Sequence, residues 1–132
     1  MKIEKVEETL QRLYLGPHQL RREDLKKARE VAALLEEIAR ISTKGSIVDA
    51  AAGHAYVALC AVELLGFESA TVIERDKKRA SRSREVAPKS VEVRQGEVSD
   101  RSLWPDKPHL VVVFATMGLS ILMQNGFSTC WQ

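Results

Sequence analysis

A chain of 132 residues with 45% hydrophobic and 29% charged residues is long enough for one domain with a buried core. No apolar run reaches the ~18 residues of a membrane span, and the first residues carry acids where a signal peptide would be apolar. We therefore expect a cytoplasmic or nuclear protein without a membrane anchor. Two cysteines are too few for a disulfide framework or a zinc site, and neither His18 nor His109 has a partner at a metal-ligand spacing.

The first 44 residues have the pattern of an N-terminal helical segment. Residues 3–14 and 19–41 place apolar side chains three or four positions apart, which predicts two amphipathic helices separated by Leu15-Gly16-Pro17. The second helix has the broader apolar face, so we expect it to pack on a sheet. A packing role is favoured over substrate recognition.

A strand, a loop of small residues and a helix follow. A buried strand ends at Asp49, residues 50–53 predict a tight turn, and an apolar helix runs from about Ala55 to Gly66, where a left-handed C-cap is usual. Small side chains in such a loop let a ligand approach the backbone and the helix N-terminus. The sequence predicts a binding site here, and the alternative is that Asp49 only caps the turn.

This stretch resembles motif I of the class I S-adenosylmethionine (SAM) dependent methyltransferases, two apolar residues followed by D-x-G-x-G-x-G with Gly or Ala at the outer positions. The matching residues are Asp49, Ala51, Gly53 and Ala55, so alanine replaces two of the three glycines. The resemblance implies SAM as the cofactor and a Rossmann-like three-layer α/β/α fold with a mostly parallel sheet. His54 lies inside the loop, where it either faces the cofactor or is held by neighbouring backbone.

A second apolar strand, residues 70–73, ends in Glu74, which follows Asp49 by 25 residues. In the family that the sequence resembles, an acid at this point accepts hydrogen bonds from both ribose hydroxyls, as in other nucleoside sites on this kind of fold. A carboxylate at Asp49 would repel the pyrophosphate of a nicotinamide dinucleotide, whereas SAM carries a sulfonium and an ammonium group. The sequence therefore favours SAM over NAD.

Positive charge is concentrated in residues 75–94, which contain eight basic and three acidic residues although the net charge of the chain is +2. Residues 76–86 predict a helix that ends before Pro88. The segment is either the solvated outside of this helix, which the lack of interleaved aromatic residues favours, or a surface for nucleic acid. The residues that would then contact phosphate include Arg75, Lys77, Lys78, Arg79, Arg82 and Arg84.

Two further strands are predicted at residues 91–94 and 109–114. Just past the third strand, the resemblance implies an acid that binds the adenine amino group; Glu97 is the candidate and Asp100 the reserve, although both also fit ordinary loop acids. We expect Trp104 to lie over an apolar patch. Directly after the fourth strand, residues 115–118 offer no acid, base or nucleophile and lack the Asn/Asp-Pro-Pro-aromatic signature, so the catalytic residues stay unknown.

The resemblance covers residues 40–115 and divides the chain into a helical segment (1–44), a SAM-binding core (45–117) and an apolar tail (118–132). A complete class I domain has seven strands, and only 18 residues follow Phe114. We expect the cofactor-binding half of such a domain with an atypical end, as in a truncated, alternatively spliced or frame-shifted product. In the implied strand order 3-2-1-4, strand 110–114 would be an exposed edge unless the tail, a second copy or a partner chain covers it.

Three functions stay open at this stage, the third weaker than the other two. The first is a SAM-dependent methyltransferase with an unidentified methyl acceptor, because methyl transfer relies on positioning and desolvation and does not demand a general base. The second is a catalytically incomplete fragment or an interaction module that keeps the fold. A nicotinamide-dependent enzyme is a third and weaker hypothesis.

Overall fold

The computed structural model describes residues 2–15, 21–41, 44–50, 54–115, 118–123 and 130–131. A six-stranded sheet runs through these residues in the order β3-β2-β1-β4-β5-β6. Its first four strands are parallel: β1 (Ser46–Ala50), β2 (Ser69–Glu74), β3 (Val91–Gln95) and β4 (Leu110–Ala115). The α/β class, the parallel sheet and the strand order 3-2-1-4 predicted from the sequence are confirmed.

Two helices precede the sheet and pack against each other. The first, α1 (Ile3–Leu10), continues into a π-helical turn, η1 (Gln11–Leu15), and the second, α2, spans Arg22–Ile41. The sequence predicts one regular helix over residues 3–14, but the turns widen from Gln11 onward. No helix in the described part of the chain is both long and apolar enough to cross a membrane.

Two more helices connect the parallel strands. Between β1 and β2, α3 (Tyr56–Cys60) continues into the π-helical turn η2 (Ala61–Leu65); between β2 and β3 lies α4 (Lys77–Val86). Gly66 ends η2 with a φ of 83°, which confirms the predicted left-handed C-cap. Connections between neighbouring parallel strands are right-handed, so both helices return over the same face of the sheet as α2.

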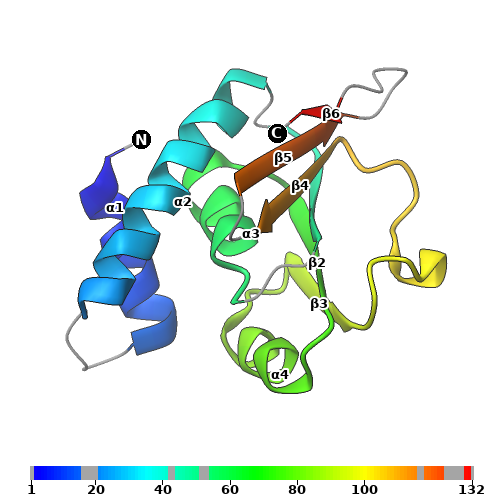
Figure 1. The fold of residues 1–132 in the computed structure, drawn as a ribbon, viewed down its shortest axis with the longest axis horizontal. Coiled ribbons are helices and arrows are strands. Elements are labelled where there is room, and N and C mark those ends of the chain that lie inside the picture. Colours follow the sequence, from blue (N-terminus) through cyan, green and yellow to red (C-terminus); the bar gives the residue numbers. More distant parts are fainter. Residues whose placement is uncertain are drawn as a thin grey trace.

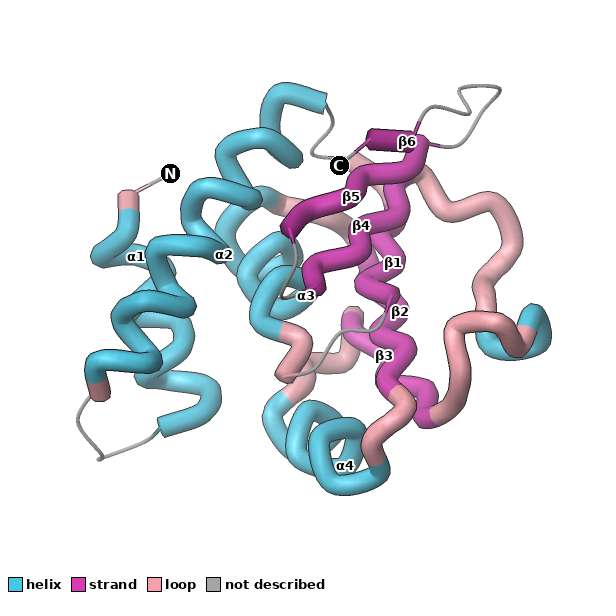
Figure 2. Tube along the Cα trace, in the orientation of Figure 1, coloured by secondary structure: helices cyan, strands magenta, loops and turns pink. Residues whose placement is uncertain are grey.

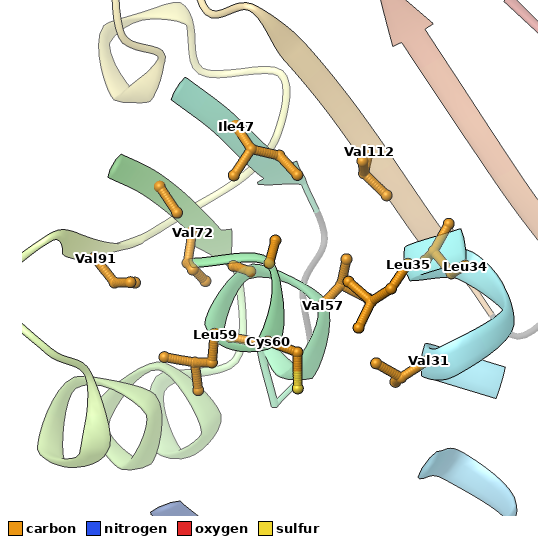
Figure 3. Packing of buried hydrophobic residues seen from close by; sticks show 14 of the residues in the cluster. Val31, Leu34, Leu35, Ile47, Val57, Leu59, Cys60, Val72, Val91 and Val112 are labelled. Carbon is orange, nitrogen blue, oxygen red and sulfur yellow. The ribbon is translucent and has the colours of Figure 1, made fainter. Parts of the chain in front are cut away.

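The main hydrophobic core lies between these helices and the sheet. Fully buried side chains of the strands, such as Ile47 and Val112, meet the buried faces of α2 and α3. Figure 3 shows Leu35 of α2 and Val57 of α3 pointing toward one another in this layer. The predicted packing of the second helix on a sheet is confirmed, and the same cluster joins the helical segment to the rest of the fold.

The opposite face of the sheet has a smaller core. Val48, Ile73 and Val111 are buried there beneath Leu103 and Trp104. This confirms the apolar patch expected under the tryptophan. Among the described residues, the layer on this face is the connection 96–109, whose regular structure is a single 3-10 turn, η3 (Arg101–Leu103) (Figure 1).

The edge of β4 is paired within the chain. β5 (Gly118–Met123) runs antiparallel to β4 along its whole length, and β6 (Cys130–Trp131) pairs with β5 (Figure 2). Of the coverings considered for this edge, the structure shows the tail folding back as a strand. The sheet is therefore mixed beyond β4.

Candidate cofactor site

Two acidic side chains lie at the ends of neighbouring parallel strands. Asp49 is the penultimate residue of β1 and Glu74 is the last residue of β2, and the two strands pair through Ala50 and Ile73. Parallel neighbours present their carboxyl ends at the same edge of a sheet, where ligands bind in open α/β folds. Both residues are almost fully buried, with 1% of Asp49 and 6% of Glu74 exposed.

The carboxylate of Asp49 connects β1 to the first turn of α3. Its Oδ2 accepts a hydrogen bond from the backbone N–H of Ala58 at 3.1 Å. Its Oδ1 is buried and has no hydrogen-bond partner among the described residues. Burial raises the pKa of Asp49 to about 7, the Ala58 N–H opposes this shift, and the negative charge of Glu74 adds to it. A buried carboxylate with one unsatisfied oxygen is suited to a cationic or hydrogen-bond-donating ligand.

Glu74 is held in place by the turn that follows β2. Its Oε2 accepts a hydrogen bond from the backbone N–H of Asp76 at 2.6 Å. Its backbone carbonyl accepts one from the N–H of Gly96 at 2.9 Å, which fixes the end of β2 beside the end of β3. The side chain is therefore positioned at the strand end, as the sequence predicts.

The structure describes only part of the predicted small-residue loop between β1 and α3. Ala51 and Gly53 lie outside the described residues, whereas Ala55, at the third glycine position of the motif, is fully buried before α3. Ala55 has φ 61° and ψ 27°, a left-handed conformation that costs an alanine roughly 1–2 kcal/mol and a glycine almost nothing. This explains why a glycine is usual at that point of the motif.

An aromatic cluster lies directly beside this loop. The exposed ring of His54 stacks on Tyr56, with 5.4 Å between ring centroids and 19° between planes. Tyr14 of η1 meets both rings edge-on, at 6.3 Å from His54 and 5.0 Å from Tyr56. The hydroxyl of Tyr14 donates to the backbone carbonyl of His54 and lies 3.4 Å from Oγ of Ser83. The backbone carbonyl of His54 is thus held by the Tyr14 side chain and not by neighbouring backbone, while the residue itself stays exposed. Contact of His54 with the cofactor stays a prediction.

Arg82 joins α4 to this cluster. Its guanidinium donates to the backbone carbonyl of Tyr14 and lies 5.7 Å from the centroid of the Tyr14 ring, a cation–π geometry. Partial burial and the positive charges of Arg79, Lys27 and Arg82 lower the pKa of His54, while Glu74 opposes them. The imidazole is therefore mainly neutral near pH 7.

Sequence reasoning missed Tyr14 and Arg82 as parts of this region. The signal for Tyr14 was that the chain has two tyrosines and that this one is the only Phe, Trp or Tyr before Tyr56. Such a side chain needs a partner for its hydroxyl when it is buried. Its partners come from sequence positions 40 to 69 residues away, which no local pattern indicates.

The two acids after β3 have different surroundings. Asp100 caps η3: its carboxylate accepts hydrogen bonds from the N–H and the hydroxyl of Ser102 at 3.0 and 2.7 Å, which lowers its pKa. A structural role thus accounts for Asp100. Glu97 is exposed in the loop after β3, and its contact with adenine stays a prediction.

Neither Cys60 nor a group of metal-binding side chains adds to the site in the described part of the chain. Cys60 is fully buried in α3, and burial raises the pKa of its thiol to about 12, as expected for an inert core residue. In the described ranges, no three His, Cys, Asp or Glu side chains are grouped so that they could hold a metal ion.

The fold is similar to that of a solved structure that is described as a methyltransferase. A "putative RNA methyltransferase PH1948" from Pyrococcus horikoshii matches with a TM-score of 0.60 and 20% sequence identity over 89% of this chain. This chain has the class I methyltransferase fold. The match covers 61% of the Pyrococcus protein, so the chain spans about three fifths of that length.

A second solved structure, described as MtNAS in complex with MTA and tNA, matches with a TM-score of 0.49 and 14% identity. That match covers 83% of this chain and 54% of the other, and it is too distant to support a conclusion about function. No protein-family profile and no curated protein sequence matches the chain.

Proposed function

We propose that this chain binds SAM and is the cofactor-binding part of a SAM-dependent methyltransferase. The observation that carries the proposal is the pair of buried carboxylates, Asp49 and Glu74, at the carboxyl ends of the two neighbouring strands β1 and β2. The methyltransferase fold of the chain and the similarity to a protein described as an RNA methyltransferase support it.

The residues present fit the cofactor. The unsatisfied Oδ1 of Asp49 offers a hydrogen-bond acceptor to SAM, and once the carboxyl is ionised it offers a negative charge to the cationic part of SAM, where it would repel a pyrophosphate. Glu74 is oriented by the Asp76 N–H and would accept hydrogen bonds from the ribose hydroxyls. When bound, SAM supplies a methyl group on a sulfonium, so the main tasks of the protein are orientation and exclusion of water.

A second candidate is a catalytically incomplete domain that keeps the fold, as a fragment or an interaction module. Two observations favour it. The chain spans 61% of the length of the Pyrococcus protein, and the strand after β4 turns back antiparallel within a few residues. Turnover and cofactor binding must therefore be measured separately.

The experiment is calorimetric titration of the whole chain with SAM and with its demethylated product. Glu74→Gln removes the charge at the carboxyl end of β2, and Glu68→Gln is the matched control because Glu68 is exposed just before the other end of the same strand. We expect binding by the wild type and the control, and a loss of about tenfold or more in Glu74→Gln, as for a hydrogen bond to a charged group.

Three other results would change the assignment. A well-folded chain that binds neither SAM nor its product would leave the fragment or interaction-module hypothesis. Binding of NAD in place of SAM would support a nicotinamide-dependent protein despite Asp49. Binding of SAM without methyl transfer to any acceptor offered would support the catalytically incomplete domain.

A further inference from the structure

Four exposed cations lie together where β2 passes into α4. We call Arg75, Lys77, Lys78 and Arg79 the basic patch. Within the described residues, none of these four side chains forms an ion pair or a side-chain hydrogen bond. The later cations of α4 differ, because Arg82 contacts Tyr14 and Glu85, and Arg84 donates to the carbonyl of Val93 at 3.2 Å.

The position of the basic patch is unfavourable for the helix itself. Three of its cations occupy the first three residues of α4, next to the positive end of the helix dipole. The Asp76 carboxylate caps this end by accepting from the N–H of Arg79 at 2.8 Å, but one acid does not balance four cations. Helix stability therefore does not account for these side chains, whereas a bound polyanion would neutralise them.

A flat aromatic surface lies beside the basic patch. The exposed ring of His54 is backed by the stacked ring of Tyr56. Both rings meet Tyr14, which lies 3.4 Å from Oγ of Ser83 and 5.7 Å from the Arg82 guanidinium, so these rings lie beside α4. The segment 75–94 contains no aromatic residue, which argued against nucleic acid from sequence alone. The fold supplies the missing aromatic from the loop that precedes α3.

We propose that the basic patch and His54 bind a single-stranded segment of nucleic acid, with phosphates on the patch and an unpaired base stacked on the His54 ring. A positively charged groove with an exposed stacking ring is the general means of binding single strands. An acidic peptide would use the cations but not the ring. The base would lie next to Asp49 and Glu74, so this inference rests on the proposed function where it names nucleic acid as the methyl acceptor.

The first test measures binding without SAM. The fluorescence anisotropy of a labelled single strand of about 12 nucleotides, as RNA and as DNA, is titrated with the whole chain at several salt concentrations. In the patch variant, Lys77, Lys78 and Arg79 are changed to glutamine. Its matched control changes Arg22, Lys26 and Arg29, three exposed cations of α2, to glutamine.

Loss of three phosphate contacts should lower the slope of log affinity against log salt by about 2 in the patch variant, at ~0.7 per contact for a single strand. The control, with the same change in net charge, should keep the wild-type slope. Equal effects of both variants would overturn the proposal, because they would reflect net charge alone.

The second test concerns the ring. His54→Ala keeps the backbone carbonyl that Tyr14 binds, so we expect an intact fold and a loss of about fivefold to tenfold in affinity. His54→Phe keeps a flat ring and should restore the affinity. No loss in His54→Ala, stronger binding of an Asp/Glu-rich peptide, or equal binding of a fully paired duplex would contradict base stacking at this position.

The two proposals can fail separately. Oligonucleotide binding that responds to both tests in a chain that does not bind SAM would remove the methyltransferase function and keep the nucleic-acid surface. SAM binding in a chain that does not bind the oligonucleotide would keep the cofactor site and remove the surface.

Discussion

Asp49 lowers the stability of the folded chain at neutral pH. The pKa of its carboxyl is 3.8 in an ordinary setting and about 7 in the fold. Between these two pH values the folded chain keeps a proton on Asp49 that the unfolded chain has lost. The stability linked to this proton is fully present below about pH 4 and is lost as the pH rises through about 7. At about 1.4 kcal/mol per pKa unit, the loss is on the order of 4 kcal/mol.

Asp49→Asn should remove this loss. Asparagine can still accept from the Ala58 N–H, and it carries no charge against Glu74. The variant and the wild type should be similarly stable near pH 4. As the pH rises to about 8, the free energy of unfolding of the variant should come to exceed that of the wild type by on the order of 2–4 kcal/mol. Urea unfolding across this range measures it, with Asp106→Asn in an exposed loop as control. Parallel pH profiles of wild type and Asp49→Asn would show that the carboxyl ionises normally.

The predictable part of the site consists of residues at the ends of strands. Asp49 and Glu74 could be assigned because a polar residue that ends an apolar run marks a strand end, and strand ends are where such folds bind ligands. The contact of Tyr14 with His54 could not be assigned, because it joins residues 40 positions apart through one hydroxyl. The prediction for Glu97 is still open.

Two glycines at the ends of elements have the same backbone conformation and different surroundings. Gly66, which ends η2, has φ 83° with open space where a β-carbon would lie; Gly45, before β1, has φ 84°, and a β-carbon there would overlap the ring of His109. Gly66→Ala should therefore cost only the strain of a left-handed alanine, about 1 kcal/mol. Gly45→Ala should cost at least about 1 kcal/mol more, because the ring must leave the Ser46 N–H that donates to it.

Denaturant unfolding of both glycine variants measures this difference. Gly45→Ala combined with His109→Ala should recover part of the loss, since the overlap is gone. Equal losses for Gly45→Ala and Gly66→Ala would mean that the imidazole moves aside without cost.

The regular elements were largely accessible from the sequence. All four parallel strands lie within one residue of their predicted ends, because buried parallel strands are short apolar runs bounded by polar or turn residues. The widened turns η1 and η2 were not predicted, because apolar spacing near 3.6 does not distinguish them from an α-helix. The widened turn η1 contains Tyr14. The unpredicted turn and the unpredicted aromatic cluster therefore lie in the same segment.

At the scale of the whole molecule, the open question from the sequence was what covers β4. The tail 118–132 is apolar and has no charged residue, which suits a strand, a helix or an interface equally well. The pairing of β5 is made by backbone groups, and those are the same for every sequence. The pattern could therefore indicate the need for a cover but not its form.

Deleting residues 118–132 should turn the β4 edge of the sheet, which β5 pairs with in the full chain, into a site of association. It removes both tail strands and leaves the backbone groups of Leu110 to Ala115 without the partners that β5 provides. An unpaired apolar edge pairs readily with another chain, so we expect dimers, larger species or precipitation that increase with protein concentration. Deletion of residues 124–132 is the control, because it keeps β5. Size-exclusion chromatography with light scattering distinguishes the two, and an unchanged, soluble monomer after the longer deletion would show that β4 does not need this cover.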